Sequence, residues 1–243
     1  MSGFVDLHCH YVPGVDDGVR TLDESQRLLR GLAALGYTEV VATPHIRTAM
    51  FENRKPGLTK AFDELTSILG PPAPSSMPRL SLAAEHFCDD VFFGLLASDQ
   101  VLPYRGGFAI LLEFRYEAWP RKIEEQLFRM QVRGLRPLIA HPERYYALFD
   151  ETDPLDPLLD VGAMTLLDTM SLSGKYGERC RRAAERMLEE GAYDAACSDA
   201  HRPEDVDVMG RSIERLRALV GKEEAQALLS TRPRGILDGS YDP

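Results

Sequence analysis

The stretch that decides the fold reads FVDLHCH and covers residues 4–10. A short, mostly apolar run of this kind is typical of a strand in a parallel sheet whose two faces are both covered. It ends in His8 and His10. Side chains two residues apart in a strand point to the same side, so the two imidazoles are expected to converge. The same order, a buried run followed by a side chain that can bind a metal, recurs along the chain.

Seven such runs are expected to be strands, because they are short, apolar and mostly bounded by Gly, Pro or charged residues. They are Phe4–His8, Glu39–Thr43, Leu80–Glu85, Phe108–Glu113, Pro137–His141, Met164–Asp168 and Asp194–Ser198. Apolar residues at helical spacing follow several of them, at Asp23–Leu35, Lys122–Arg133, Tyr176–Glu190, Asp207–Val220 and Glu223–Leu229. Strand–helix alternation predicts a parallel α/β sheet covered by helices. Seven strands in 243 residues fit a closed or distorted barrel, in one domain spanning residues 1–243.

The composition excludes several classes of protein. Hydrophobic residues make up 44% of the chain and charged residues 27%, close to the average for a soluble globular protein. No apolar run approaches the roughly 20 residues that span a bilayer, and no signal peptide is visible, so no membrane insertion is expected. A net charge of −10 argues against non-specific binding of nucleic acid. The four cysteines are scattered, which favours a reducing cytoplasm.

Five of the six histidines lie at the end of a predicted strand or just past it, namely His8, His10, His45, His141 and His201. Glu85 and Glu113 end predicted strands in the same way. In a parallel barrel all strand carboxyl ends open onto one face, so these groups are expected to meet. One such residue alone would more often be structural, but this many together indicate a metal centre. Imidazoles and carboxylates suit Zn, Mn or Fe.

Two further places offer carboxylates to the same face. Residues 13–18 read PGVDDG, which is typical of a turn, and either Asp16 or Asp17 could point inward from it. Asp199 and His201 lie two residues apart after the last predicted strand, so both are expected on one side.

These motifs together resemble the polymerase-and-histidinol-phosphatase (PHP) superfamily. The resemblance rests on VDLHCH with PGVDDG at 5–18, ATPH at 42–45, LEF at 112–114, HPERY at 141–145 and SDAH at 198–201, and it runs from residue 4 to about residue 237. Within the superfamily the chain looks like the bacterial manganese-dependent protein-tyrosine phosphatases, which act on capsule and exopolysaccharide tyrosine kinases.

The resemblance implies a distorted seven-stranded (β/α) barrel with two or three metal ions at the carboxyl ends of the strands. Manganese is the metal expected first, and Fe or Zn would suit the same ligands. It assigns His8, His10, Glu85 and Asp199 to one ion, Glu85, Glu113 and His141 to a second, and Asp17, His45 and His201 to a third. It thus selects Asp17 over Asp16.

The catalytic residues expected beside these ligands are Arg144, Asp199, His201 and Arg202. The resemblance gives Arg144 to substrate binding, and its guanidinium can offer a fork of donors to phosphate oxygens. Arg202 and Arg232 stand where the family often has Asn, which bears on substrate preference.

The expected reaction is hydrolysis of phosphotyrosine by in-line attack of a metal-bound hydroxide, with no phospho-enzyme. The expected partner is a phosphotyrosine protein, a bacterial tyrosine autokinase that controls exopolysaccharide synthesis. One alternative is a PHP-type phosphatase of a small ester such as histidinol phosphate, and another is a non-catalytic metal-binding regulator. The sequence leaves the oligomeric state open.

A cysteine phosphatase is the remaining alternative, because CRRAAER at 180–186 matches the pattern C-x5-R. The segment has no glycine, and its Ala and Glu content favours a helix over a phosphate-binding loop. It is therefore interpreted as a basic helix face. His86 is expected to pack in the core, because it follows Glu85 and should point to the opposite side.

Overall fold

The computed structural model describes residues 3–72, 76–119 and 123–242. Every strand pair in this part of the chain is parallel, which confirms the predicted type of sheet. One sheet has the order β1-β2-β4, with β1 Phe4–Cys9, β2 Tyr37–Ala42 and β4 Arg79–Leu82. The second has the order β3-β5-β6-β7-β8-β9, with β3 His45–Ile46, β5 Glu85–Phe87, β6 Ala109–Glu113, β7 Arg136–Ala140, β8 Met164–Asp168 and β9 Ala195–Cys197.

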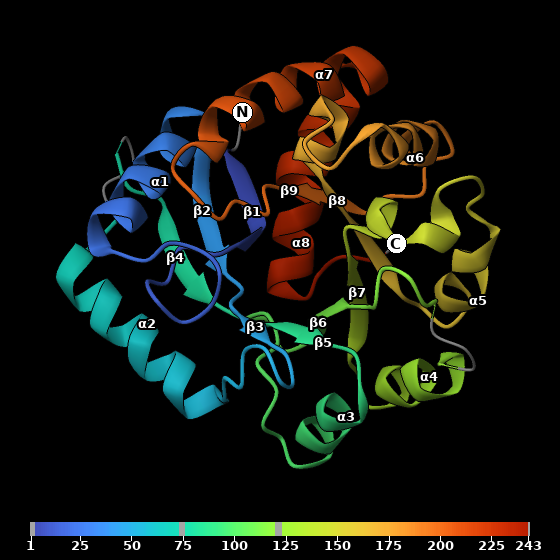
Figure 1. Cartoon of the computed structure of the whole chain (residues 1–243), viewed down its shortest axis with the longest axis horizontal. Coiled ribbons are helices and arrows are strands. Elements are labelled where there is room, and N and C mark those ends of the chain that lie inside the picture. The colour runs from blue at the N-terminus through green and yellow to red at the C-terminus, as the bar shows by residue number, and fades with distance from the viewer. Residues whose placement is uncertain (1–2, 73–75, 120–122, 243) are drawn as a thin grey trace.

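Helices surround the strands, as Figure 1 shows. The α-helices of the described residues are α1 Leu22–Ala34, α2 Lys55–Leu69, α3 Asp90–Ala97, α4 Glu124–Val132, α5 Asp156–Leu159, α6 Glu178–Glu189, α7 Asp205–Gln226 and α8 Arg232–Asp238. No residue range was predicted for helices α2, α3, α5 and α8. The predicted start of α4, Lys122, lies outside the described residues. Helix α7 runs through Gly221, whose φ of 81° kinks it at the predicted boundary between two helices.

The prediction of one strand over Leu80–Glu85 was wrong. Strand β4 stays paired with β2 up to Ala42 and Leu82, and Glu85 begins β5 instead of ending β4. Pro44 explains the break: it has no N–H to continue the β2 ladder, while its carbonyl accepts the Glu85 N–H at 3.2 Å. The chain therefore crosses from the first sheet to the second, and the described residues form nine short strands where the sequence predicted seven.

The two sheets also approach each other at β1 and β9. Cys9 and Ala200 form an isolated parallel bridge, and the Asp199 N–H donates to the His8 carbonyl at 2.8 Å. The carboxylate of Asp6 accepts from the Ser198 N–H at 2.9 Å, so a buried side chain joins β1 to the segment after β9. These bonds hold His8 and Asp199 on neighbouring segments although 191 positions separate them in sequence.

The apolar core has an inner and an outer part. Small and medium side chains from both sheets, among them Val5, Ala109 and Leu138, form an inner cluster with Ile236 and Leu237 of α8. In Figure 1 α8 crosses the middle of the ring of strands. A larger cluster packs the outward faces of the strands against the surrounding helices. Helix α8 therefore fills the interior at one end of the strands and leaves the carboxyl ends open to polar side chains.

Glu39 links α8 to the strands through a buried carboxylate. Its oxygens pair with Arg105 and with Arg234, the latter at 3.4 Å. The two arginine side chains are 35% and 33% exposed. Their charges are therefore partly screened by water, and the network is worth less than a fully buried ion pair.

We expect Glu39→Gln to lower the free energy of unfolding by roughly 1–2 kcal/mol, because two guanidinium groups lose their carboxylate. The urea midpoint measured by circular dichroism checks this. Glu64→Gln is the matched control, since Glu64 is exposed and pairs only with Lys60 at 3.8 Å. Equal midpoints for the two variants would contradict the assignment.

Candidate metal centre

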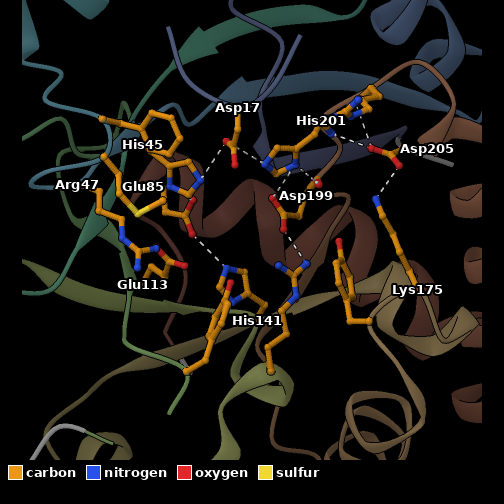
Figure 2. A pocket seen from close by; sticks show the side chains of 16 residues that line it. Asp17, His45, Arg47, Glu85, Glu113, His141, Lys175, Asp199, His201 and Asp205 are labelled. Carbon is orange, nitrogen blue, oxygen red and sulfur yellow. Dashed lines mark hydrogen bonds and ion pairs between the residues drawn. The ribbon is translucent and has the colours of Figure 1, made fainter. Parts of the chain in front are cut away.

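The carboxyl ends of the strands bring all nine predicted ligands together. Each belongs to a group of side chains whose ligand atoms lie within 4.8 Å of one another. The groups are His8, His10 and Glu85; His8, His141 and Asp199; His45, Glu85 and Glu113; and His10, Asp17, His45 and His201. Figure 2 shows His45 and His141 on either side of Glu85, with Asp17 and His201 nearer Asp199. These groups differ from the division into ions implied by the resemblance: Glu113 groups with His45, His141 and Asp199 group with His8, and His10 also joins the group of Asp17.

The donor atoms of this cluster fit divalent cations. Five buried atoms of these side chains have no hydrogen-bond partner among the described residues, namely His8 Nε2, His10 Nε2, Glu85 Oε2, His141 Nδ1 and Asp199 Oδ1. Asp199 Oδ1 lies 3.2 Å from His8 Nε2 and 3.3 Å from His10 Nε2. Buried polar atoms without partners are costly, and imidazole nitrogens and carboxylate oxygens facing a common space can be satisfied together by Mn, Fe or Zn.

Outer partners hold three of the imidazoles so that Nε2 faces inward. The Nδ1 atoms of His8, His10 and His201 bond to Thr43 Oγ1, Asp16 Oδ2 and the Asp199 carbonyl, respectively. This is the usual arrangement around metal-binding histidines, whose second nitrogen is tied to an oxygen acceptor.

The two neighbouring aspartates of the PGVDDG turn have different places. Asp16 accepts from His10 Nδ1 at 2.8 Å and from the backbone N–H groups of His45 and Gly18 at 3.1 and 3.0 Å. Asp17 instead lies 3.5 Å from the Nε2 atoms of both His45 and His201. Asp16 thus positions the ring of His10, a role that the sequence analysis missed, and Asp17 faces the cluster.

Backbone geometry also brings two site residues inward. His141 and Asp199 have φ values of 37° and 46°, in the left-handed region that non-glycine residues rarely adopt. The sequence argument placed Asp199 and His201 on one side because of strand alternation. That reason was wrong, since β9 ends at Cys197 and a sharp turn follows it. Such strain is found where the surrounding structure holds a functional side chain.

The site's electrostatics are those of a crowded cluster. Burial alone would lower the pKa of His45, but Glu85, Glu113 and Asp17 raise it to about 10. Burial and the neighbouring Glu85 raise the pKa of Glu113 to about 7. Burial and the positive charge of Arg144 lower the pKa of His141 to about 4. Closely spaced acids and bases of this kind are typical of a functional site.

The cluster forms the floor of a pocket of about 510 Å³. Two arginines that were predicted to be catalytic, Arg144 and the exposed Arg202, line this pocket. Arg232 instead pairs with Glu224 at 2.7 Å and is not among the lining residues. The pocket is also lined by residues that were not predicted from the sequence, among them Arg47, Met50, Phe51, Lys175, Tyr176 and Asp205. Only the fold brings them to the mouth, because none of them ends a predicted strand.

Comparison with known proteins agrees with this site. A family model described as capsular polysaccharide synthesis, CpsB/CapC, matches residues 4–238. The chain belongs to this CpsB/CapC family. It is 28% identical over 201 residues to the tyrosine-protein phosphatase YwqE of Bacillus subtilis, covering 81% of this chain and 77% of that protein. It is 26% identical over 239 residues to the tyrosine-protein phosphatase CpsB of Streptococcus pneumoniae, covering 96% of this chain and 98% of CpsB.

The likeness to CpsB/CapC-family proteins extends to three dimensions. A crystal structure from a study of YwqE and CpsB, described as unique metal-dependent tyrosine phosphatases, matches with a TM-score of 0.87 and 25% identity. The match covers 98% of this chain and 95% of that one. Among the described residues of this family member, no helix is long and apolar enough to cross a membrane.

Cys180 lies apart from the site in this CpsB/CapC-family chain. It is buried on helix α6, which spans Glu178–Glu189 and so confirms the predicted helix over the C-x5-R segment. Burial and the neighbouring Glu143 raise the pKa of its thiol, which disfavours the reactive thiolate. His86 is buried as expected, and its Nε2 accepts from the Leu102 N–H at 3.3 Å.

Gly18 offers a test of the cluster, because an added Cβ would lie 2.3 Å from the carbonyl oxygen of His10 and 2.5 Å from its Cβ. We expect Gly18→Ala to displace His10 and to lower the amount of Mn²⁺ retained per chain after dialysis, measured by atomic absorption, by at least about half.

Gly14→Ala in the same turn is the control. Gly14 has a φ of 70° with nothing within 4 Å, so this change should cost about 1–2 kcal/mol of stability and leave metal retention unchanged. Full retention of Mn²⁺ by Gly18→Ala would show that the position of His10 does not govern metal binding.

Proposed function

We propose that this chain is a metal-dependent protein-tyrosine phosphatase that hydrolyses phosphotyrosine. The observation that carries the proposal is the set of buried, inward-facing imidazole and carboxylate atoms without partners at the floor of a pocket that Arg144 also lines. Membership of a family whose relatives are named tyrosine-protein phosphatases supports the same reaction.

Nine residues would hold the metal ions: His8, His10, Asp17, His45, Glu85, Glu113, His141, Asp199 and His201. Two or three ions are expected from this number of ligands, with manganese first and Fe or Zn as the alternatives. When bound, such ions neutralise phosphate charge and lower the pKa of water.

The chain's own groups would bind and orient the ester. Arg144 is positively charged, largely buried beside Asp199 and part of the pocket lining, so it is placed to donate to phosphate oxygens. Arg202 stands at the exposed rim and His201 at the entrance of the cluster. Among the described residues, the pocket lining contains no cysteine or serine that could attack the phosphate. This supports direct attack by water in line with the leaving phenol. A phenol of pKa near 10 leaves without a strong general acid.

Aromatic walls support an aryl ester as the substrate. The ring of Phe51 stacks on His45 with centroids 5.2 Å apart and planes at 9°. The ring of Tyr116 meets His141 edge-on at 5.9 Å. Both rings line the pocket, as does Met50, which is 59% exposed. A phenyl group entering between them would bury apolar surface that a phosphoserine side chain lacks.

The resemblance also implies a natural substrate, a cellular location and a domain organisation, which we propose for this chain. The natural substrate would be a bacterial tyrosine autokinase that controls exopolysaccharide or capsule synthesis, met in the cytoplasm. The parallel sheets, which meet at β1 and β9, would be parts of one distorted (β/α) barrel forming a single domain over residues 1–243.

The first experiment measures phosphate release from a phosphotyrosine peptide and a matched phosphoserine peptide, with Mn²⁺ and with a chelator. We expect Mn²⁺-dependent release from the phosphotyrosine peptide at least about 100-fold faster than from the phosphoserine peptide, because only the aromatic ester fills the pocket. Turnover of histidinol phosphate with neither peptide cleaved would favour the small-ester phosphatase. No release from any ester would favour a metal-binding regulator.

Cys180→Ser should retain phosphatase activity within about twofold, since the thiol lies on a helix outside the pocket. His8→Ala, measured in the same assay, should lose phosphatase activity by a larger factor. Removing an outer partner of a metal ligand lowers activity roughly 10–100-fold, and His8 is itself a candidate ligand. Loss of activity in Cys180→Ser, with normal metal content, would instead favour a cysteine phosphatase mechanism.

A further inference from the structure

Arg144 is held by more than one carboxylate. It lies just after β7, its side chain is 10% exposed, and its Nη2 donates to Asp168 and to Asp199, the latter at 2.7 Å. Figure 2 shows the bond from Asp199 to the guanidinium. One nitrogen therefore serves two acids, and the two acids have different surroundings.

Asp199 belongs to the metal cluster, whereas Asp168 does not. The second oxygen of Asp199 faces His8 and His10. Asp168 is absent from the groups of candidate ligands, and its carboxylate accepts from Arg144 Nη2 and from the Met170 N–H, the latter at 2.8 Å. Its carboxylate is therefore not expected to bind a metal. It instead holds Arg144 and the loop after β8.

Tyr176 completes the arrangement. The guanidinium carbon of Arg144 lies 3.7 Å from the centroid of its ring, a cation–π contact. The hydroxyl of the same tyrosine interacts with Asp168 and partly offsets the rise that burial causes in the pKa of that carboxyl. The three side chains thus fix one edge and one face of the guanidinium, while no described residue accepts a bond from Nη1.

The backbone under Asp168 is itself anchored. Glu143, the residue before Arg144, is fully buried and accepts from the Asp168 N–H at 3.1 Å and from the Ser171 hydroxyl at 2.8 Å. Its other oxygen accepts from the Tyr193 hydroxyl at 3.1 Å. This ties the loop that carries Arg144 to the end of β8, so that Arg144 and Asp168 keep their separation.

We propose that Asp168 and Tyr176 are positioning residues that hold the Arg144 guanidinium ready for the phosphate of the substrate. The proposal rests on the proposed function, since it concerns the phosphate subsite of the same pocket. A guanidinium fixed before binding loses little freedom when it meets the phosphate. Without Asp168, the Arg144 guanidinium would keep only its bond to Asp199 and would no longer be fixed in one orientation.

The test measures binding of inorganic phosphate to the Mn²⁺-loaded protein by isothermal titration calorimetry. We expect Asp168→Asn to raise the Kd for phosphate about tenfold, as expected when an outer partner of a functional group is removed, with bound Mn²⁺ and kcat for the phosphotyrosine peptide almost unchanged. KM should rise in parallel with the Kd. Tyr176→Phe keeps the ring and loses the hydroxyl, so it should weaken binding by a smaller factor.

A double-mutant cycle separates positioning from a general structural role. In an Arg144→Ala background, Asp168→Asn should have no further effect on the Kd for phosphate. Asp194→Asn is the matched control: this aspartate accepts from the Thr165 N–H at 2.8 Å and the Tyr241 hydroxyl at 2.9 Å and does not line the pocket, so phosphate affinity should not change.

Two results would overturn the proposal: an unchanged Kd in both Asp168→Asn and Tyr176→Phe, or equal weakening by Asp168→Asn with and without Arg144. Failure of the proposed function would look different. If the phosphotyrosine peptide is not cleaved but the cycle shows coupling between Arg144 and Asp168, the positioning role stands and only the aryl substrate is wrong.

Discussion

The structure depends on one costly arrangement, a group of imidazoles and carboxylates buried together at the carboxyl ends of parallel strands. Five of their atoms have no hydrogen-bond partner among the described residues. Burying such atoms opposes folding unless cations or bound ligand satisfy them, so the surrounding fold must hold the cluster against relaxation. The left-handed backbone at His141 and Asp199 and the break in pairing at Pro44 both serve that purpose.

Three side chains of the site are each held from behind by an oxygen atom. Thr43 holds His8, Asp16 holds His10, and Asp168 holds Arg144. These three partners lie in or next to the segments that carry the ligands. The end of one strand can fix a side chain of a neighbouring segment without a long loop. The result is a rigid polar floor under a mouth lined by Phe51, Tyr116 and Tyr176. The floor suits a phosphate and the walls suit a phenyl ring, which agrees with the names of relatives at 26–28% identity.

Most of the site was predictable because its chemistry follows strand ends. His8, Glu113 and His141 each end or follow a predicted strand, and the structure brings them to one pocket floor. Asp168 ends the predicted strand Met164–Asp168 and could have been found by the same rule, which was applied only to the glutamates. Arg47 and Phe51 could not have been predicted by this rule. They flank a tight turn after strand β3, and this strand of two residues is too short to give a periodic pattern.

The sequence by itself determined the parallel α/β architecture, because buried strand periodicity and helix amphipathicity are local properties of neighbouring residues. It also determined which residue types gather at the strand ends. The tertiary structure decided the number of strands, since Pro44 and the crossing from β4 to β5 depend on which sheet accepts each N–H. It also decided that Asp17 faces the cluster while Asp16 supports His10. Adjacent residues of the same type carry the same local signal, and only contacts between distant segments tell them apart.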